Sequence, residues 1–390
     1  MSPKWFVRRR GRMVAGLAAL ALLAAGCGSV ASGPSAGPQP TGPAAPALNT
    51  AADAAGGTWA TIPMGAASGA DEFWQLFVLP AGSERWSLQT PPDIATNGAI
   101  MLAAPGGAAK ALAAGVGPSL DLRFSPITST SDLGRTWTTR PPQSGLANLP
   151  DALAAAPDGH LLALGQDGGV TVTSGPGGTW NTLTTERALA GSLTGCGLTG
   201  LTAAAYAPAG TPLLAGTCSQ PGRTALLGYT GGAWHRVSPA LPAALSGQRI
   251  RVLRLSRTSR GDVALLAAGT TASVRLLAAW TSDGGRHWAL SPVLPPSAAA
   301  DSASVGADGG LGVVLAGKRA ETIAGPGSSW RRTPALPSGR TVTLALPSGG
   351  GTEVLAADVG TLTVWRFAGS PAAWVKTQTI KVPIQYGSSN

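Results

Sequence analysis

An eight-residue pattern occurs twice in this chain and limits its fold more than any other feature. Thr130–Trp137 reads TSDLGRTW and Thr281–Trp288 reads TSDGGRHW, so both segments fit (S/T)-x-D-x-G-x-x-W. In such a segment the aspartate accepts hydrogen bonds from backbone N–H groups and tightens a turn. The glycine tolerates a positive φ, and the tryptophan packs between neighbouring sheets. The pattern therefore predicts a structural role at six positions: Asp132, Gly134, Trp137, Asp283, Gly285 and Trp288.

Weaker copies of the pattern place a tryptophan after a glycine-containing turn elsewhere in the chain. With the two full copies, the tryptophans are Trp86, Trp137, Trp180, Trp234, Trp288, Trp330 and Trp374. They lie roughly 42 to 54 residues apart, an interval that suits a unit of four short strands. Short apolar runs alternate with turns between them, as in Leu161–Gly165 followed by Gln166–Gly169. Because Gly and Pro interrupt every apolar run within about ten residues, a long helical repeat is excluded.

The repeated segment resembles the Asp-box, or BNR repeat, of β-propellers such as sialidases, sortilin-type receptors and photosystem II assembly factors. The resemblance implies an all-β fold, a β-propeller of four-stranded antiparallel blades. Six units are complete, and Gly57–Pro92 holds a shorter one. We expect Val375–Gln385 to complete that partial sheet and close the ring. Seven blades are therefore favoured, with six as the alternative.

The N-terminus predicts the location of the protein. Lysine and arginine residues precede Met13–Gly26, an uncharged and mostly apolar run that is too short to span a membrane. The run ends in Leu23-Ala24-Ala25-Gly26-Cys27, which resembles a bacterial lipobox. The resemblance implies that residues 1–26 are a signal peptide and that Cys27 carries a lipid at the outer face of the cytoplasmic membrane. The alternative is an ordinary secretory signal followed by a chance cysteine.

Composition divides the rest of the chain into two parts. Residues 27–57 consist almost entirely of Ala, Gly, Pro, Ser and Thr, which cannot form a core and therefore predict a disordered tether. Residues 58–390 are assigned to the propeller. The formal net charge of +10 includes five positive residues of the signal, which leaves 23 Lys and Arg against 18 Asp and Glu. With charged residues at only 12%, nucleic acid is not an expected partner.

Two of the three cysteines are expected to form a disulfide. Cys196 precedes the inner strand of one predicted unit, and Cys218 ends the next strand, so both lie at the same end of one hairpin. A bond at this position is geometrically reasonable and suits an oxidising compartment.

No catalytic, metal or cofactor site is predicted. The three histidines, His160, His235 and His287, lie in different units, and neither HExxH nor an EF-hand loop occurs. Sialidases use three arginines, a Tyr–Glu pair, an Asp acid and an Arg-Ile-Pro motif, and that motif is missing here. The resemblance therefore covers the scaffold and stops before the active site. A diverged sialidase-like glycoside hydrolase, with Glu186 as a candidate residue, is the alternative.

One set of loops is predicted to carry a ligand face. Loops between the second and third strands, and between successive units, contain Arg140, Arg187, Arg223, Arg249, Arg319 and Arg340. These charges are either solvated loop residues or an anion-recognising surface, since guanidinium groups suit carboxylates and phosphates. We predict a non-catalytic, monomeric, lipid-anchored extracytoplasmic propeller that binds or scaffolds a cell-envelope protein or acidic glycan.

Overall fold

The structure is a computed structural model of residues 1–390 that describes 47–48, 50–53, 55–65, 72–92, 100–104, 112–116, 125–139, 146, 150–174, 178–270, 273–316, 319–369 and 372–383. The chain divides into two units, Met1–Gln39 and Pro40–Asn390, and only the second contains described residues. The predicted signal peptide 1–26, Cys27 and Arg140 lie outside the described residues. No helix among the described residues is long and apolar enough to cross a membrane.

Short antiparallel strands form most of the described chain, which confirms the all-β expectation. The first three sheets each contain four consecutive strands. They are β2 (Thr50–Ala52), β3 (Thr58–Gly65), β4 (Glu72–Leu79) and β5 (Ser87–Leu88); β6 (Ile100–Ala103), β7 (Leu112–Val116), β8 (Ile127–Thr130) and β9 (Thr138–Thr139); and β10 (Ala152–Ala155), β11 (Leu161–Leu164), β12 (Gly169–Thr173) and β13 (Trp180–Thr185). The helix α1 (Glu186–Ser192) follows the third sheet, and Thr185 caps its N-terminus by accepting a hydrogen bond from the Ala188 N–H.

The largest sheet has nine strands and consists of two four-strand runs. These are β14 (Leu198–Tyr206), β15 (Pro212–Cys218), β16 (Thr224–Thr230) and β17 (Ala233–Arg236), then β18 (Ile250–Thr258), β19 (Gly261–Gly269), β20 (Val274–Thr281) and β21 (Ala289–Leu290), with β22 (Leu294–Ser297) beside β20. Between β15 and β18 the pairing is limited to Thr217 and Arg251.

Two further sheets complete the fold. One contains β23 (Ala300–Val305), β24 (Leu311–Leu315), β25 (Arg319–Ile323) and β26 (Arg331–Arg332), with β1 (Ala47–Leu48) parallel to β23. The other contains β27 (Thr341–Ala345), β28 (Glu353–Asp358), β29 (Thr361–Gly369) and β30 (Ala372–Lys381).

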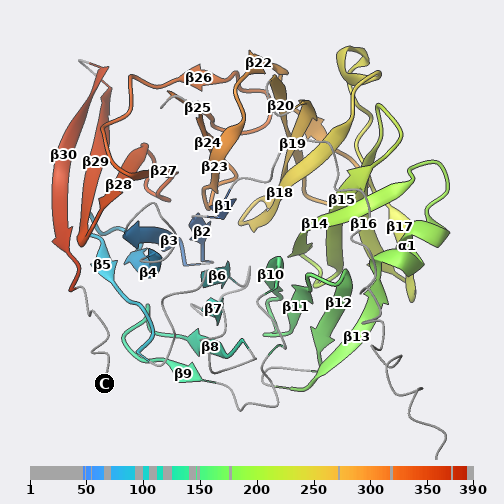
Figure 1. The fold of residues 1–390 in the computed structure, drawn as a ribbon, viewed down its shortest axis with the longest axis horizontal. Helices are drawn as coiled ribbons and strands as arrows, with labels where there is room; N and C mark the ends of the chain where they lie inside the picture. Colours follow the sequence, from blue (N-terminus) through green and yellow to red (C-terminus); the bar gives the residue numbers. More distant parts are fainter. Residues whose placement is uncertain are drawn as a thin grey trace, which may run out of the picture. The chain divides into compact units, whose positions relative to one another are not determined.

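The sheets of the second unit follow one another around a common centre (Figure 1). The contacts between inner strands run from β2 to β6, β10, β14, β18, β23 and β27, and β27 returns to β3. Apolar clusters fill the spaces between neighbouring sheets; one of them joins β10–β13 to β14–β17. Strands such as β11 are buried along their whole length, so they are continuously apolar and do not alternate.

Two predictions are wrong: the end of the tether and the sheet to which the C-terminal segment belongs. The predicted tether, residues 27–57, contains β1 and β2, and β2 is the inner strand of the first sheet because Thr50 pairs with Ala60 and Ala52 with Thr58. The C-terminal segment does not complete that sheet. Instead β30 pairs with β29 along its whole length, from Ala372 to Lys381. β2 therefore completes the first sheet, and the C-terminal strand β30 completes the last one.

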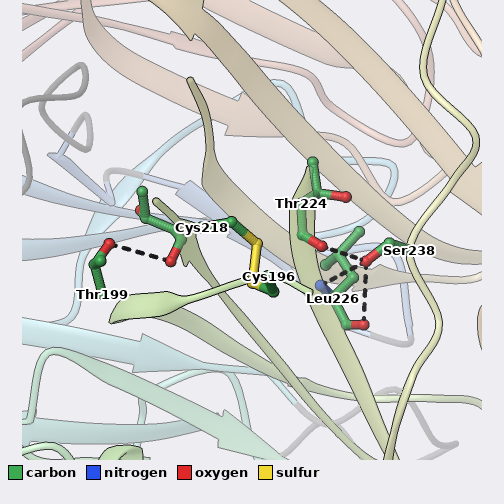
Figure 2. The surroundings of a disulfide bond; sticks show 7 residues. Cys196, Thr199, Cys218, Thr224, Leu226 and Ser238 are labelled. Atoms are coloured by element: carbon green, nitrogen blue, oxygen red, sulfur yellow. Dashed lines mark hydrogen bonds between the residues drawn. A yellow bond between two sulfur atoms is a disulfide. The ribbon is translucent and has the colours of Figure 1, made fainter. Parts of the chain in front are cut away.

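The predicted disulfide joins Cys196 to Cys218, 22 residues apart, at one end of the β14–β15 hairpin (Figure 2). Both cysteines are buried, and Cys218 is the last residue of β15. The bond lies in the apolar cluster between β10–β13 and β14–β17. It therefore fixes the loop after α1 to the end of β15.

The turns within Thr130–Trp137 and Thr281–Trp288 have the same hydrogen bonds. Asp132 Oδ1 accepts from the Thr136 N–H at 2.9 Å and from the Thr130 hydroxyl at 2.8 Å, and Thr130 Oγ1 accepts from the Gly134 N–H at 3.0 Å. Asp283, Thr281, Gly285 and His287 repeat this network. These bonds lower the pKa of Asp132 to about 2, mainly through Thr136. Each turn joins the third and fourth strands of its sheet, so the six residues have the predicted structural placement.

Three tryptophans, in or just before an outer strand, attach one four-strand unit to the preceding one. The indole N–H of Trp288 donates to the Val237 carbonyl at 2.6 Å, and that of Trp330 donates to the Pro292 carbonyl at 3.0 Å. Trp374 donates in the same way to the Pro334 carbonyl at 3.4 Å. For these three residues the tryptophan spacing in the sequence reports a repeated contact between neighbouring four-strand units.

The two adjacent glycines of the second turn provide a matched test. Both have positive φ, but a Cβ on Gly285 would lie 2.7 Å from the Cβ of Val237, whereas one on Gly284 has 3.9 Å to its nearest neighbour. We expect Gly284→Ala to lower the free energy of unfolding by about 1 kcal/mol through backbone strain alone. Gly285→Ala adds overpacking and is expected to cost about 2 kcal/mol. Urea denaturation checks both, and equal losses would contradict the contact with Val237.

Candidate functional site

A cavity of about 270 Å³ lies among the inner strands. Its walls come from β2, β6, β10, β14 and β18, with Val305 of β23 and Trp74 of β4. Most of the lining is alanine and leucine, as in Ala152–Ala155 and Ala203–Ala205. Small side chains allow the inner strands to approach one another and still leave a central space, which suits a closed ring of sheets.

Two arginines of β18 line this apolar cavity. Arg254 is buried, and its guanidinium donates to the Ala303 carbonyl on β23 at 3.4 Å. Burial lowers the pKa of Arg254 to about 10. Arg257 is half-buried and donates to the carbonyls of Ala207 at 3.1 Å and Pro208 at 3.5 Å. The cavity therefore presents one buried and one half-buried cationic group, and charge interactions with the buried group are less screened than in water.

Arg254 and Arg257 point to opposite sides of β18, because they lie three residues apart in a regularly paired part of the strand. The register of β18 against β19 shifts between Val252 and Arg254, so Leu253 is an extra residue. Arg254 then reaches β23 in the next sheet, and Arg257 reaches the β14–β15 turn in the previous sheet. One arginine of β18 therefore contacts β23, and the other contacts the β14–β15 turn.

The acidic and hydroxyl groups of the lining do not form an activated pair. Among the described lining residues Asp151 is the one carboxylate, and desolvation raises its pKa. Burial, together with the nearby Asp158 charge, raises the pKa of Tyr206. A nucleophilic tyrosine needs the opposite shift. The two carboxylates of an ordinary glycosidase are not both present in this part of the lining.

Five of the six predicted loop arginines lie in connections at one edge of the sheets. Each lies in a connection from second to third strand or between sheets, and these two kinds of connection leave an antiparallel sheet on the same side. Arg187 lies in α1, Arg223 precedes β16, Arg249 precedes β18, Arg319 begins β25 and Arg340 precedes β27. All five are exposed, and they are separate from the cavity lining. Their proposed ligand face stays a prediction.

The histidines are dispersed, as expected. His160 contacts Asp158 at 2.9 Å, His287 contacts Asp283 at 2.6 Å, and His235 lies in β17. The described residues contain no group of three or more His, Cys, Asp or Glu that could hold a metal ion.

The cavity arginines are the residues that sequence reasoning missed. The signal is visible in Ile250–Thr258, where Arg251, Arg254 and Arg257 interrupt an otherwise apolar strand every third position. Simple alternation places Arg254 and Arg257 on opposite faces, and the bulge between Arg251 and Arg254 is not visible in the sequence.

Neither a protein-family model nor a characterised protein matches the sequence. In fold, the chain is similar to a candidate 6-phosphogluconolactonase from Bacteroides uniformis ATCC 8492, with 14% identity over 83% of this chain and 96% of that chain and a TM-score of 0.52. A second candidate 6-phosphogluconolactonase, from Bacteroides fragilis NCTC 9343, is 14% identical over 83% of this chain and 95% of that chain, with a TM-score of 0.50. YCF48 from Cyanidioschyzon merolae is 14% identical over 85% of this chain and 98% of that chain, with a TM-score of 0.49.

These similarities establish the fold alone. The neighbours are β-propellers, so the present chain is a β-propeller built from antiparallel sheets. Identity of 14% does not transfer an active site, because one fold supports many unrelated functions.

Proposed function

We propose that this chain is a lipid-anchored, extracytoplasmic β-propeller that binds an acidic protein segment or glycan of the cell envelope in its central cavity and has no chemistry of its own. The observation that carries the binding role is the placement of Arg254 and Arg257 in an apolar cavity. The anchor and the compartment follow from the lipobox-like segment ending at Cys27.

The propeller has seven blades in this proposal. The nine-stranded sheet counts as two blades, β14–β17 and β18–β21, since the pairing between them is confined to Thr217 and Arg251. The apolar clusters of the described residues support this count, because each one lies between neighbouring four-strand units.

An anionic ligand fits the energetics of the cavity. Burial disfavours the charged form of Arg254, and a carboxylate placed beside it would offset that cost. Arg257 uses its two terminal nitrogens on backbone carbonyls, which are neutral acceptors. Hydrogen bonds to a charged acceptor are roughly twice as strong as those to a neutral one.

The absence of chemistry rests on the environment of the lining residues. The pKa of Tyr206 is raised and so is that of Asp151, and the described lining offers no second carboxylate. The two Bacteroides neighbours are candidate lactonases, and the sequence resembles sialidases in its turns. Hydrolysis of 6-phosphogluconolactone or of a fluorogenic sialoside by the purified protein would therefore contradict the proposal, as would loss of such turnover in Glu186→Gln.

Binding to two probes tests the cavity against the loop face. Oligogalacturonate and a hexaglutamate peptide represent the acidic glycan and the acidic protein segment, and calorimetry measures their affinity. We expect Arg254→Met with Arg257→Gln to weaken binding at least tenfold, since each lost charged contact is worth about 1.5 to 3 kcal/mol. The matched control is Arg223→Gln with Arg319→Gln on the exposed loops, which is expected to change affinity less than twofold. If the loop variant weakened binding and the cavity variant did not, the ligand would bind at the loops and not in the cavity.

A further inference from the structure

A second cavity lies away from the central one, at the end of the sheet where the β18–β19 turn and the β20–β21 turn meet. Its volume is about 520 Å³. Its lining includes Asp262, Asp283 and Asp308 together with Trp280 and Trp288. None of these five residues lines the central cavity, so the two spaces are chemically distinct.

Asp262 is the unusual member of this lining. It is the second residue of β19, and only 1% of its surface is exposed. Neither of its carboxylate oxygens has a hydrogen-bond partner among the described residues. A buried carboxylate in this state is costly, and native structures normally supply it with a donor or a cation.

The neighbouring arginine does not fill that role. Arg257 lies opposite Asp262 in the β18–β19 ladder, and its charge acts to lower the pKa of Asp262. The terminal nitrogens of Arg257, however, donate to the Ala207 and Pro208 carbonyls. Desolvation therefore dominates and raises the pKa of Asp262 to about 7.

The other lining groups suit an organic cation. The Trp280 indole N–H donates to the Gly309 carbonyl at 2.7 Å, and that of Trp288 donates to the Val237 carbonyl, so neither indole N–H is left to donate to a ligand. Aromatic faces attract ammonium and guanidinium groups. A metal ion is a poorer fit, because no metal-binding group of three or more His, Cys, Asp or Glu occurs in the described part of the chain.

We infer that this cavity binds one cationic side chain of a polypeptide partner, with Asp262 as its buried counterion and Trp280 and Trp288 beside the alkyl stem. The ammonium of lysine and the guanidinium of arginine share the required chemistry. Occupation supplies the donor that both Asp262 oxygens lack, and it puts the apolar stem against the indole rings. The site does not depend on the anion-binding role proposed for the central cavity.

Binding should depend on pH through Asp262. A cation binds the ionised carboxylate, so protonation competes with it, and affinity should fall roughly tenfold from pH 8 to pH 6 for a pKa of about 7. The other charged groups around the cavity are Arg257 on β18, Arg260 on the β18–β19 turn, Asp283 and His287 on the β20–β21 turn, and Asp308 on the β23–β24 turn. His287→Gln separates their contribution, and it is expected to preserve the pH dependence.

The experiment uses three probes on the folded protein and reads tryptophan fluorescence. These are N-acetyl-lysine methylamide, N-acetyl-arginine methylamide and the neutral N-acetyl-norleucine methylamide. We expect the cationic probes to bind at least tenfold more tightly than norleucine at pH 8. Asp262→Asn is expected to remove both this preference and the pH dependence, while Asp167→Asn, an exposed carboxylate in another sheet, is expected to change neither.

A stability measurement keeps the inference testable if probe binding is weak. Because burial raises the pKa of Asp262 in the folded state, its ionisation opposes folding, and stability is lost as pH rises from about 4 to about 7. In thermal unfolding, Asp262→Asn is expected to melt higher than the wild type at pH 8 and to lose this pH trend, and saturating lysine probe is expected to raise the wild-type Tm alone. Equal affinity for norleucine, or an unchanged affinity in Asp262→Asn, would overturn the inference.

Discussion

Replacement of Glu353 by alanine is expected to lower the free energy of unfolding by about 3 kcal/mol, because it removes the central acceptor of a buried network. Only 2% of Glu353 is exposed. Its Oε1 accepts from Nε of Arg366 at 3.0 Å and from a terminal nitrogen at 2.9 Å, and its Oε2 accepts from the Trp86 indole at 2.8 Å. Alanine leaves that indole N–H without its acceptor.

The network is important because it lies where the first and last sheets meet. Trp86 precedes β5 in the first sheet, whereas Glu353 begins β28 in the last. The backbone of Trp86 also exchanges two hydrogen bonds with the Gln378 side chain on β30, at 2.9 and 2.8 Å. The chain itself does not cross this junction, so its side-chain contacts hold the ring closed.

A matched control separates the buried carboxylate from an exposed one on the same arginine. Glu84 accepts from Arg366 at 3.0 Å, but 79% of its side chain is exposed. We expect Glu84→Ala to cost about 0.5 kcal/mol, as for surface ion pairs generally. Guanidinium denaturation with both variants measures the difference. Equal effects would show that the junction does not depend on the buried acceptor.

The fold could be predicted where the sequence pattern reports a contact that recurs. The tryptophan spacing is informative because Trp288, Trp330 and Trp374 each bind a carbonyl of the preceding sheet. Asp132 and Asp283 could be assigned to turns because local hydrogen bonds of this kind involve residues two to four positions apart. Hydrogen bonds between residues so close in sequence can be predicted from a short sequence motif.

Ring closure could not be predicted, because it depends on contacts between distant parts of the chain. Thr50–Ala52 has the composition of a linker, yet it is an inner strand, where the small side chains of Ala51 and Ala52 line the central cavity. Small residues are suitable for both a flexible tether and a crowded centre. Composition alone therefore placed the boundary between the predicted tether and the propeller about ten residues too late.

The candidate site was missed for a related reason. Exposed arginines in loops are easily recognised, whereas Arg254 lies inside a strand that otherwise reads as core. Its direction depends on the register shift beside Leu253. Asp262 is similar: its burial follows from the packing of two turns, which one strand's pattern does not contain.

Removal of the disulfide is expected to lower the free energy of unfolding by about 3 kcal/mol. Cys196 and Cys218 close a loop with a sequence separation of 22, and the chain-entropy relation for a loop of that length gives about this value. Cys196→Ala with Cys218→Ala tests it, because the double variant leaves no unpaired thiol between the sheets. Urea denaturation of the second unit, residues 40–390, measures the loss against the oxidised wild type.

Reduction of the wild type provides the control for side-chain packing. Both sulfurs are buried, and their neighbours in the cluster, such as Leu198 and Leu214, are apolar, so the reduced thiols still fill the space between the sheets. We expect the reduced wild type to lose nearly as much stability as the double variant, because the covalent link is what both lack. A reduced protein as stable as the oxidised one would show that packing, and not the bond, holds this hairpin.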